Sequence, residues 1–132
     1  MIVVDTNIIS YLLLPTEFSD KASQLYQSEP EWAAPVLWRS EFRNVLALYL
    51  RKKIITLAEA LILQEEAEAL MLDREFTVTS VSILSLTDSS TCSAYDCEFV
   101  ALARQLSVKL VTEDKKILAE FPDVAVSLNQ YA

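Results

Sequence analysis

The chain has 132 residues, of which 52% are hydrophobic, and its formal net charge is −8. Its length fits a single domain, residues 1–132, and its charge argues against a uniformly basic nucleic-acid-binding surface, though not against a local basic groove. Because the chain contains no histidine and no glycine, Ser-His-Asp and Cys-His catalysis and glycine-rich phosphate loops are excluded. Carboxylates are therefore the main groups left for chemistry.

No apolar run approaches the roughly 18 residues of a transmembrane helix, and the first residues lack the basic region and cleavage site of a signal peptide. We therefore expect a cytoplasmic protein without a membrane segment. Cys92 and Cys97 are too few for a disulfide framework, and without histidine they complete no typical zinc site. They are expected to be reduced, half-buried thiols, with a disulfide or redox pair as the alternative.

Segments typical of strands and of helices alternate along the chain. Strands are predicted at residues 1–4, 32–34, 76–80, 108–112 and 124–126. Helices are predicted at residues 7–14, 19–28, 37–53, 56–72, 82–88, 96–106 and 115–121. This alternation predicts an α/β sandwich in which a mainly parallel sheet has helices on both faces.

The two longest helices, 37–53 and 56–72, are separated by a short turn and are expected to form an antiparallel hairpin. Thr56 and Glu59 make a capping box at the start of the second helix. The hairpin carries more apolar residues than one small sheet can cover, among them Leu46, Leu50, Leu57, Leu61 and Leu63. We therefore expect it to offer a surface to a second copy of the chain or to a partner protein.

Two acids directly follow predicted strands. Asp5 comes after a run of four apolar residues typical of a buried parallel strand, and ligands bind at the carboxyl edge of such sheets. The alternative is that Asp5 or Thr6 only caps the next helix. Asp114 follows the strand at 108–112, with a turn or helix cap before Lys115 as its alternative.

Two further acids interrupt apolar helix faces. Glu41 lies on the face that carries Leu37, Val45 and Leu48. An ion pair with a neighbouring arginine is the alternative, because unpaired buried acids are rare. Asp96 lies on the apolar face of its own helix, at the helix start, where an N-cap is the alternative.

The carboxyl ends of parallel strands and the first turns of the helices that follow meet along one sheet edge. Asp5, Asp96 and Asp114 should converge there, and Glu41 joins them if its side chain points inward. Carboxylates roughly 5 Å apart repel by about 3 kcal/mol per pair at an effective dielectric of about 20, so such a cluster needs a cation or shared protons. Oxygen ligands favour Mg²⁺ or Mn²⁺, and such an ion supports hydrolysis of phosphodiester bonds.

Four sequence motifs contain these acids in order along the chain. They are I-V-V-D-T-N-I-I at the N-terminus, S-E-F-R-N-V-L around Glu41, Y-D-C-E-F-V-A-L-A around Asp96 and L-V-T-E-D-K-K-I-L around Asp114. With these motifs the chain resembles the PIN-domain ribonucleases, in particular the VapC-like toxins of bacterial and archaeal toxin–antitoxin pairs. The resemblance covers nearly the whole chain. It departs from the family around Ser107, where such proteins commonly have glycine before the fourth strand.

This resemblance implies a PIN-like three-layer sandwich and a Mg²⁺- or Mn²⁺-dependent endoribonuclease. The family's catalytic acids match Asp5, Glu41, Asp96 and Asp114, and the metal ligands among them are Asp5, Asp96 and Asp114. Thr6 and Asn7 match polar positions where a hydroxyl or an amide can orient a ligand or water. The resemblance also implies a homodimer and a cognate antitoxin whose tail covers the active site.

Several basic residues could contact RNA phosphates. Arg39 and Arg43 are the first candidates, and Arg51, Lys52 and Lys53 follow in the same helix. The alternative for most of them is ordinary solvated surface charge.

Two other functions stay open on the sequence. A catalytically weak PIN-like domain would act by docking a partner through the helical hairpin. An aspartate-based phosphotransferase would use Asp5 as its nucleophile, but the second acid that it requires two residues later is replaced by Asn7.

Overall fold

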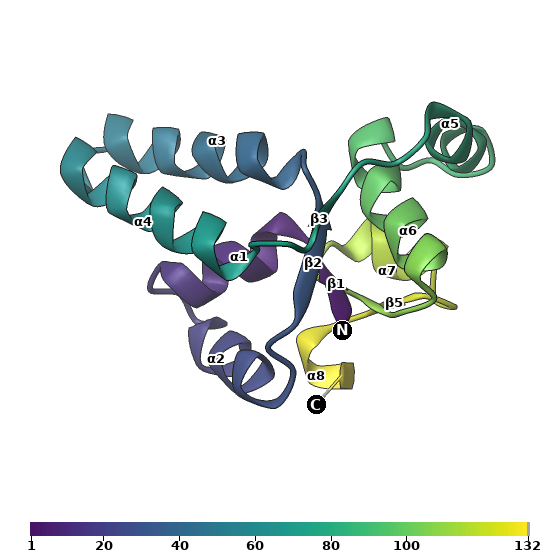
Figure 1. Cartoon of the computed structure of the whole chain (residues 1–132), viewed down its shortest axis with the longest axis horizontal. Helices are drawn as coiled ribbons and strands as arrows, with labels where there is room; N and C mark the ends of the chain where they lie inside the picture. The colour runs from purple at the N-terminus through teal and green to yellow at the C-terminus, as the bar shows by residue number, and fades with distance from the viewer. Residues whose placement is uncertain (132) are drawn as a thin grey trace.

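A computed structural model describes residues 1–131, whose five parallel strands form one central sheet (Figure 1). The strands are β1 (Ile2–Val4), β2 (Trp32–Pro35), β3 (Glu75–Phe76), β4 (Leu110–Val111) and β5 (Ala125–Val126). Their order across the sheet is β3-β2-β1-β4-β5, and each neighbouring pair is parallel. The predicted α/β sandwich with a parallel sheet is thereby confirmed.

The helices form the two outer layers of the sandwich. They are α1 (Thr6–Leu13), α2 (Ser19–Ser28), α3 (Trp38–Arg51), α4 (Leu57–Leu70), α5 (Ser80–Asp88), α6 (Ala94–Leu106), α7 (Lys115–Glu120) and α8 (Leu128–Tyr131). Figure 1 shows α1 to α4 on one side of the sheet and α5 to α7 on the other. Within residues 1–131, no helix has the length and apolarity needed to cross a bilayer.

The middle of the sheet is fully apolar. All three residues of β1 are buried, as are the four residues of β2, which is the pattern of strands covered on both faces. Helix α6 packs against β1, β2 and β4, and α1 packs against β1 from the other layer. Both cysteines, Cys92 and Cys97, are free and buried.

The predicted helical hairpin is present, with α3 and α4 lying side by side (Figure 1). The capping box that starts α4 is formed in full, because the Thr56 hydroxyl accepts from the Glu59 N–H and the Glu59 carboxylate accepts from the Thr56 N–H. Leu46 is buried. Leu57 and Leu61 are 63% and 58% exposed, so part of the hairpin's apolar surface is not covered by this chain.

The structure shortens two predicted strands and adds one helix. The strand expected at 76–80 is limited to Glu75–Phe76, because Thr79 already caps α5 by accepting a hydrogen bond from the Ser82 N–H. The strand expected at 108–112 is limited to Leu110–Val111. The short helix α8 was not predicted; it follows β5 and packs against α2.

The chain turns without glycine. Lys53, Asp73 and Ser107 adopt positive φ angles of 58°, 68° and 56° in its place. Ser107 ends α6, and its N–H donates to the Arg104 carbonyl. These left-handed residues reverse the chain after α3, α4 and α6.

The strand order changes direction next to β1. The chain passes from β1 outward to β2 and β3 on one side, while β4 and β5 lie on the other. In open α/β sheets the crevice outside the carboxyl ends at such a switch point is the usual ligand site. Asp5 follows β1 at this point, and Asp114 lies three residues after β4.

Candidate active site

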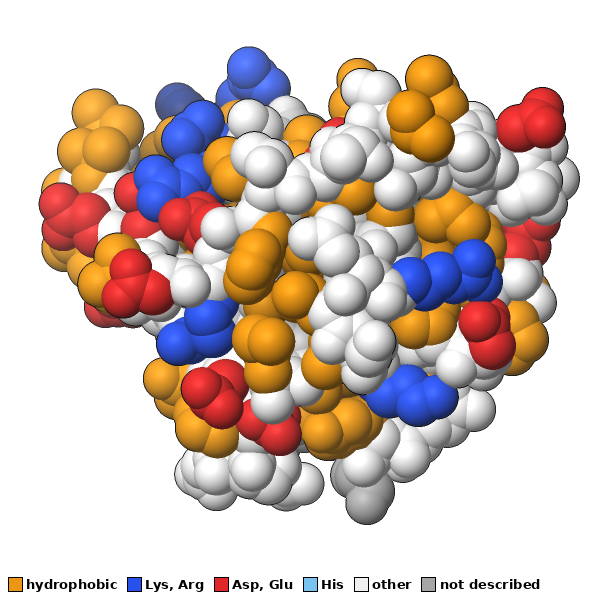
Figure 2. Space-filling view, turned by 45° about the vertical axis from the view of Figure 1, so that its right-hand side comes forward, with side chains coloured by type: hydrophobic (Ala, Val, Ile, Leu, Met, Phe, Trp, Pro, Cys, Tyr) orange, Lys and Arg blue, Asp and Glu red, His pale blue; other side chains and the backbone are white. Residues whose placement is uncertain are grey.

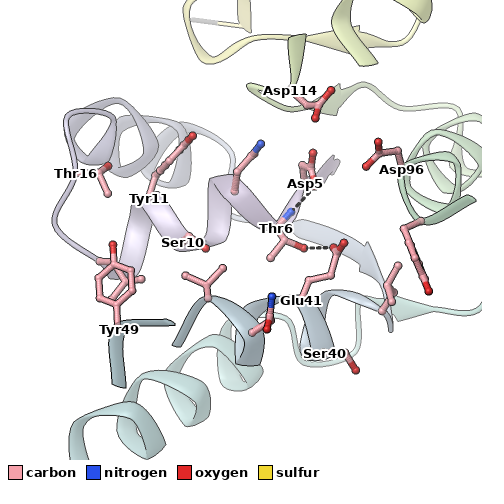
Figure 3. A pocket seen from close by; sticks show the side chains of 16 residues that line it. Asp5, Thr6, Ser10, Tyr11, Thr16, Ser40, Glu41, Tyr49, Asp96 and Asp114 are labelled. Carbon is pink, nitrogen blue, oxygen red and sulfur yellow. Dashed lines mark hydrogen bonds between the residues drawn. The ribbon is translucent and has the colours of Figure 1, made fainter. Parts of the chain in front are cut away.

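A cavity of about 840 Å³ opens at the carboxyl edge of β1 and β4. It is lined by residues of α1, α3 and α6 and by Asp114 at the start of α7. All four predicted acids, Asp5, Glu41, Asp96 and Asp114, line it, and Figure 3 shows their carboxylates gathered in one part of the cavity. The convergence predicted from the sequence is therefore present in the structure.

Asp5 is fixed by two hydrogen bonds. Its Oδ1 accepts from the Thr6 N–H at 2.7 Å, and its Oδ2 accepts from the Thr112 hydroxyl, also at 2.7 Å. Asp5 is therefore the N-cap of α1 as well as a wall of the cavity, so the two alternatives for this residue coexist. The second bond crosses from β1 to the end of β4 and ties the two strands together at the switch point.

Burial raises the pKa of Asp5 to about 7. The hydrogen bonds from Thr112 and Thr6 lower the pKa, and the charges of Glu41 and Asp96 raise it. The side chain is only 9% exposed. Loss of water from the charged form thus outweighs two good hydrogen bonds.

Glu41 lies in the first turn of α3 and is held by α1. Its Oε1 accepts a 2.7 Å hydrogen bond from the Thr6 hydroxyl (Figure 3). Its pKa is raised by burial first and by the charges of Asp96 and Glu98, while the Thr6 hydrogen bond lowers it. The alternative of an arginine partner is not formed among the described ion pairs.

The apolar stripe expected around Glu41 is not the one that α3 buries. The buried residues of the helix are Trp38, Phe42 and Leu46, and Leu48 is 50% exposed. Leu37, Glu41 and Val45 form the neighbouring stripe and line the cavity. The acid therefore lies on the wall of a cavity and not within the packed core.

Asp96 is the third residue of α6 and not its N-cap. Ser93 caps the helix, and its hydroxyl accepts from the Asp96 N–H at 3.1 Å. The Asp96 side chain points into the cavity (Figure 3). Burial and the nearby Asp114 carboxylate raise the pKa of Asp96, while the Ser93 hydrogen bond and Lys116 lower it.

Asp114 is the N-cap of α7, as its alternative predicted. Its Oδ1 accepts from the Ile117 N–H at 2.9 Å, and its own N–H donates to the Thr112 hydroxyl at 3.0 Å. Its side chain also lines the cavity. Thr112 therefore contacts two of the predicted metal ligands, Asp5 through its hydroxyl proton and Asp114 through its hydroxyl oxygen.

The cavity contains no built-in counter-charge. Four acids line it, and none of the lining residues is lysine or arginine. Two more oxygen atoms in the wall, Asn7 Oδ1 and Ser10 Oγ, are buried without a hydrogen-bond partner in the part of the chain that the structure describes. Buried polar atoms are nearly always paired in folded proteins, so these two atoms can accept a hydrogen bond from water or from a group bound in the cavity.

The donor set fits a hard divalent cation. No three acidic or cysteine side chains of residues 1–131 stand close enough to form a complete metal site by themselves. Mg²⁺ does not need such a cage, because it usually takes one or two carboxylates together with waters and substrate phosphate oxygens. Oxygen atoms from carboxylates and an amide are the ligands that Mg²⁺ and Mn²⁺ prefer.

The comparison with known families agrees with this geometry. The family model for the PIN domain matches residues 2–125. The chain belongs to the PIN-domain family. No curated protein sequence matches it.

Solved structures share the PIN fold over nearly the full length of the chain. A toxin–antitoxin complex from Klebsiella pneumoniae has a TM-score of 0.72 at 17% identity and covers 97% of this chain and 98% of its own. FitAcB from Neisseria gonorrhoeae has a TM-score of 0.70 at 23% identity, with 96% of each chain covered. PAE2754 from Pyrobaculum aerophilum has a TM-score of 0.71 at 17% identity and covers 98% of this chain and 91% of its own. At these identities the likeness establishes the fold.

The two arginines predicted to contact RNA lie outside the cavity of this PIN domain. Arg39 is held by Glu75 through its Nε and Nη2 atoms at 2.6 and 2.7 Å, and by Glu68 through Nη1 at 3.0 Å. Arg43 is exposed on α3. Figure 2 shows Lys and Arg side chains grouped at the upper left of one face beside acidic ones, and a mainly uncharged middle. A phosphate contact by either arginine stays a prediction.

Several residues in and behind this cavity were not among the predicted site residues. Thr112 is buried behind Asp5 and does not line the cavity; it could have been predicted, because it is a hydroxyl residue directly after an apolar strand, in the same position relative to β4 as Asp5 is to β1. Ser10, Asn44 and Tyr49 line the cavity itself. They carried no such signal, because they come together only where α1 lies beside α3.

Proposed function

We propose that this PIN domain is a Mg²⁺- or Mn²⁺-dependent endoribonuclease that acts as a single domain. The observation that carries the proposal is the cavity with four acids and no basic residue, in which the pKa of Asp5 is raised to about 7. A site with this charge attracts a cation, and the oxygen donors select a hard one. RNA as the substrate class is supported by the resemblance of the four acidic motifs to PIN-domain ribonucleases.

Asp5, Asp96 and Asp114 are the candidate metal ligands, of which one or two would bind the ion directly and the others through its waters, and the ion, when bound, would supply Lewis acidity for hydrolysis of a phosphodiester bond. The protein's own residues position these groups. Thr112 and the Thr6 N–H keep both oxygens of Asp5 in place. Orientation of this kind matters because reacting groups must be held within a fraction of an ångström of their productive positions.

Glu41 is the candidate proton acceptor. Thr6 holds its Oε1, and Oε2 can take the proton of the attacking water. The raised pKa of Glu41 brings the carboxylate nearer to the pH at which general bases act best. Asn7, whose Oδ1 is buried and unpaired next to these acids, is placed to orient that water.

We further propose that the chain is the toxin of a toxin–antitoxin pair and forms a homodimer. Support for a protein partner comes from the exposed leucines of α4, Leu57 and Leu61, and from the fold shared with a Klebsiella pneumoniae chain described as part of a toxin–antitoxin complex. A cytoplasmic location follows from that role. The alternative, a catalytically weak domain that acts by docking a partner, is favoured by the same exposed leucines.

The test is cleavage of single-stranded RNA in Mn²⁺ or Mg²⁺ by the purified protein and by two variants, Asp5→Asn and Asp96→Asn. Asp88→Asn is the matched control, because Asp88 is an exposed residue at the end of α5, outside the cavity. We expect cleavage by the wild type and the control, abolition by EDTA, and at least about 100-fold slower cleavage by both variants.

Growth arrest on expression should follow the same pattern, with the variants folded by circular dichroism. If Asp5→Asn and Asp96→Asn cleave RNA and arrest growth as the wild type does, the nuclease assignment is wrong. If the wild type cleaves no RNA at any metal concentration but binds a partner protein, the docking domain is the better description. Cleavage of DNA in place of RNA would overturn the substrate class.

A further inference from the structure

The cavity continues beyond the acids as a groove between α1 and α3. Thr6 and Ser10 are four residues apart and therefore on one face of α1, and they line one wall together with Leu14 at the end of the helix. Glu41, Val45 and Tyr49 line the α3 wall with the same spacing. Eight residues of α-helix separate Glu41 from Tyr49, so the groove extends about 12 Å past the acidic part of the cavity.

Figure 3 shows Tyr49 and Thr16 at the opposite end of the cavity from Asp96, with Ser10 between them and the acids. This half of the cavity, which we call the α1–α3 groove, comprises Ser10, Leu14, Asn44, Val45 and Tyr49. None of these five residues has a charged side chain. A phosphate group would therefore find no counter-charge there.

Ser10 supplies independent evidence for a ligand in the groove. Its side chain is 8% exposed, and its Oγ has no hydrogen-bond partner in the part of the chain that the structure describes. Buried hydroxyls are nearly always satisfied. A group bound in the groove would supply the missing partner.

Tyr49 borders the end of the groove with part of its aromatic ring, which also packs against the core. It is half-buried, and no aromatic side chain among the described residues stacks on it. Tyr11, by contrast, is packed on Phe18 with 4.7 Å between ring centroids. Asn44, also on α3, adds an amide that can both donate and accept hydrogen bonds.

We propose that the α1–α3 groove binds one unstacked base of single-stranded RNA, in the nucleotide next to the bond that is cut. Tyr49 stacks on the base, and Ser10 Oγ hydrogen-bonds to its edge. An aromatic face, a hydroxyl and an amide without charge are the groups with which proteins read splayed-out bases. The base-binding site rests on the proposed nuclease function for its position relative to the cleaved bond, and it excludes duplex RNA, whose paired bases cannot enter the groove.

The first experiment measures binding without cleavage. Adenosine, guanosine, cytidine and uridine carry no phosphate, so their binding in metal-free buffer can be followed by saturation-transfer NMR without repulsion from the acids. We expect at least one nucleoside to bind the wild type and Tyr49→Phe. Tyr49→Leu, which removes the aromatic face, should weaken binding by about fivefold to about 150-fold, the range for stacking of one base on an aromatic ring.

Tyr26→Leu is the matched control. Tyr26 packs on Trp32 away from the cavity, so the same substitution there tests whether loss of an aromatic ring elsewhere changes binding. Ser10→Ala should change the preference among the four nucleosides. It should not lower stability, because it removes an unpaired buried hydroxyl; a serine with a purely structural role would leave the preference unchanged.

The second experiment measures cleavage of an RNA oligonucleotide in Mn²⁺, with an abasic nucleotide placed at each position in turn. We expect one position beside the cleaved bond to raise KM at least fivefold in the wild type and in Tyr49→Phe, and to have no such effect in Tyr49→Leu. Equal cleavage of every abasic RNA by the wild type would overturn the base-binding site and leave the nuclease assignment intact.

If no RNA is cleaved, the nucleoside-binding experiment still tests the base-binding site. Binding that depends on Tyr49 supports the groove while the nuclease assignment fails, and absence of binding overturns the groove as well. If Tyr49→Leu weakens binding of a lysine- and arginine-rich peptide but of no nucleoside, the groove belongs to a protein partner and the base-binding site is wrong.

Discussion

Helix α3 separates two groups of acidic side chains that have opposite electrostatic environments. On one side, Glu75 accepts hydrogen bonds from the Trp38 indole at 2.8 Å and from Arg39 at 2.6 and 2.7 Å, and these contacts, with Arg39 first, lower its pKa. On the other side, Glu41 faces three aspartates and no basic residue, and burial raises its pKa. Trp38 and Glu41 are less than one helical turn apart.

The contrast shows how one helix can border two different acids, because α3 holds Glu75 of β3 through Trp38 and Arg39 and carries Glu41 on its cavity side. Glu75 has its partners within the chain, so its charge stabilises the fold. The acids of the cavity have hydroxyl and backbone partners but no lysine or arginine in the cavity wall, and Lys116 offsets only part of the charge at Asp96, so most of their repulsion is relieved by protons or by a bound cation. Substitution of acids on the two sides should therefore have opposite effects on stability and on activity.

The largest expected effect is on the pH dependence of stability in metal-free buffer. The pKa of Asp5 is about 7 in the folded chain and 3.8 as its ordinary value, so between these values the folded state holds a proton that the unfolded state has lost. The contribution of this proton to the free energy of unfolding is fully present below pH 4 and is lost as the pH rises to 7. The loss for this residue is up to about 4 kcal/mol. Urea denaturation between pH 5 and 8 measures it.

Asp5→Asn should remove most of this pH dependence and be more stable than the wild type at pH 8. Saturating Mn²⁺ should stabilise the wild type at pH 8 and not the variant. Carboxylates with lowered pKa values, such as Glu75, change the stability only below the ordinary pKa of glutamate. Their effect therefore lies outside this pH window. If the free energy of unfolding depends on pH in Asp5→Asn as it does in the wild type, ionisation of Asp5 does not destabilise the folded chain.

The second expected effect is on catalysis. Glu41→Gln should lower kcat/KM for RNA cleavage by about 100-fold or more, because an amide cannot accept the proton, without loss of stability at pH 8. Glu98→Gln is the control, since Glu98 also has a pKa raised by burial but does not line the cavity. Equal losses in both variants would mean that Glu41 acts only through the overall charge.

The smallest of the three effects is on the structural side. Glu75→Ala leaves the buried Trp38 indole N–H without its acceptor and should lower the free energy of unfolding by about 1–3 kcal/mol. Glu75→Gln keeps an oxygen for Trp38 and should lose less. Both should leave kcat/KM within about twofold of the wild type under conditions where they are folded, and a larger change would link this side of α3 to the cavity.

The sequence was sufficient to predict residues whose position follows from the chain alone. Asp5 and Asp114 could be placed because each follows an apolar strand, and the start of α4 because Thr56 and Glu59 have the capping-box spacing. The segment 76–80 misled because its alternating pattern is typical of a strand, while the Thr79 hydroxyl instead caps α5. Local side-chain hydrogen bonds decided that boundary.

The far end of the cavity could not be predicted, because it depends on the packing of two helices. Tyr49 and Ser10 are about forty residues apart and become neighbours in one groove only when α3 lies beside α1. Glu41 was identified for the wrong reason. Its helix buries the stripe of Trp38 and Phe42, which is shifted by one residue from the stripe that contains Glu41.

Lys53, Asp73 and Ser107, which turn the chain where glycine would be the easiest residue, also affect the unfolded state. Each pays a steric cost of roughly 1–2 kcal/mol in the left-handed region. A chain without a single glycine has fewer backbone conformations to lose on folding, because glycine loses more conformational freedom than any other residue. The unfolded chain thus has less backbone entropy to lose on folding. This favours the folded state and offsets part of the strain in the three turns.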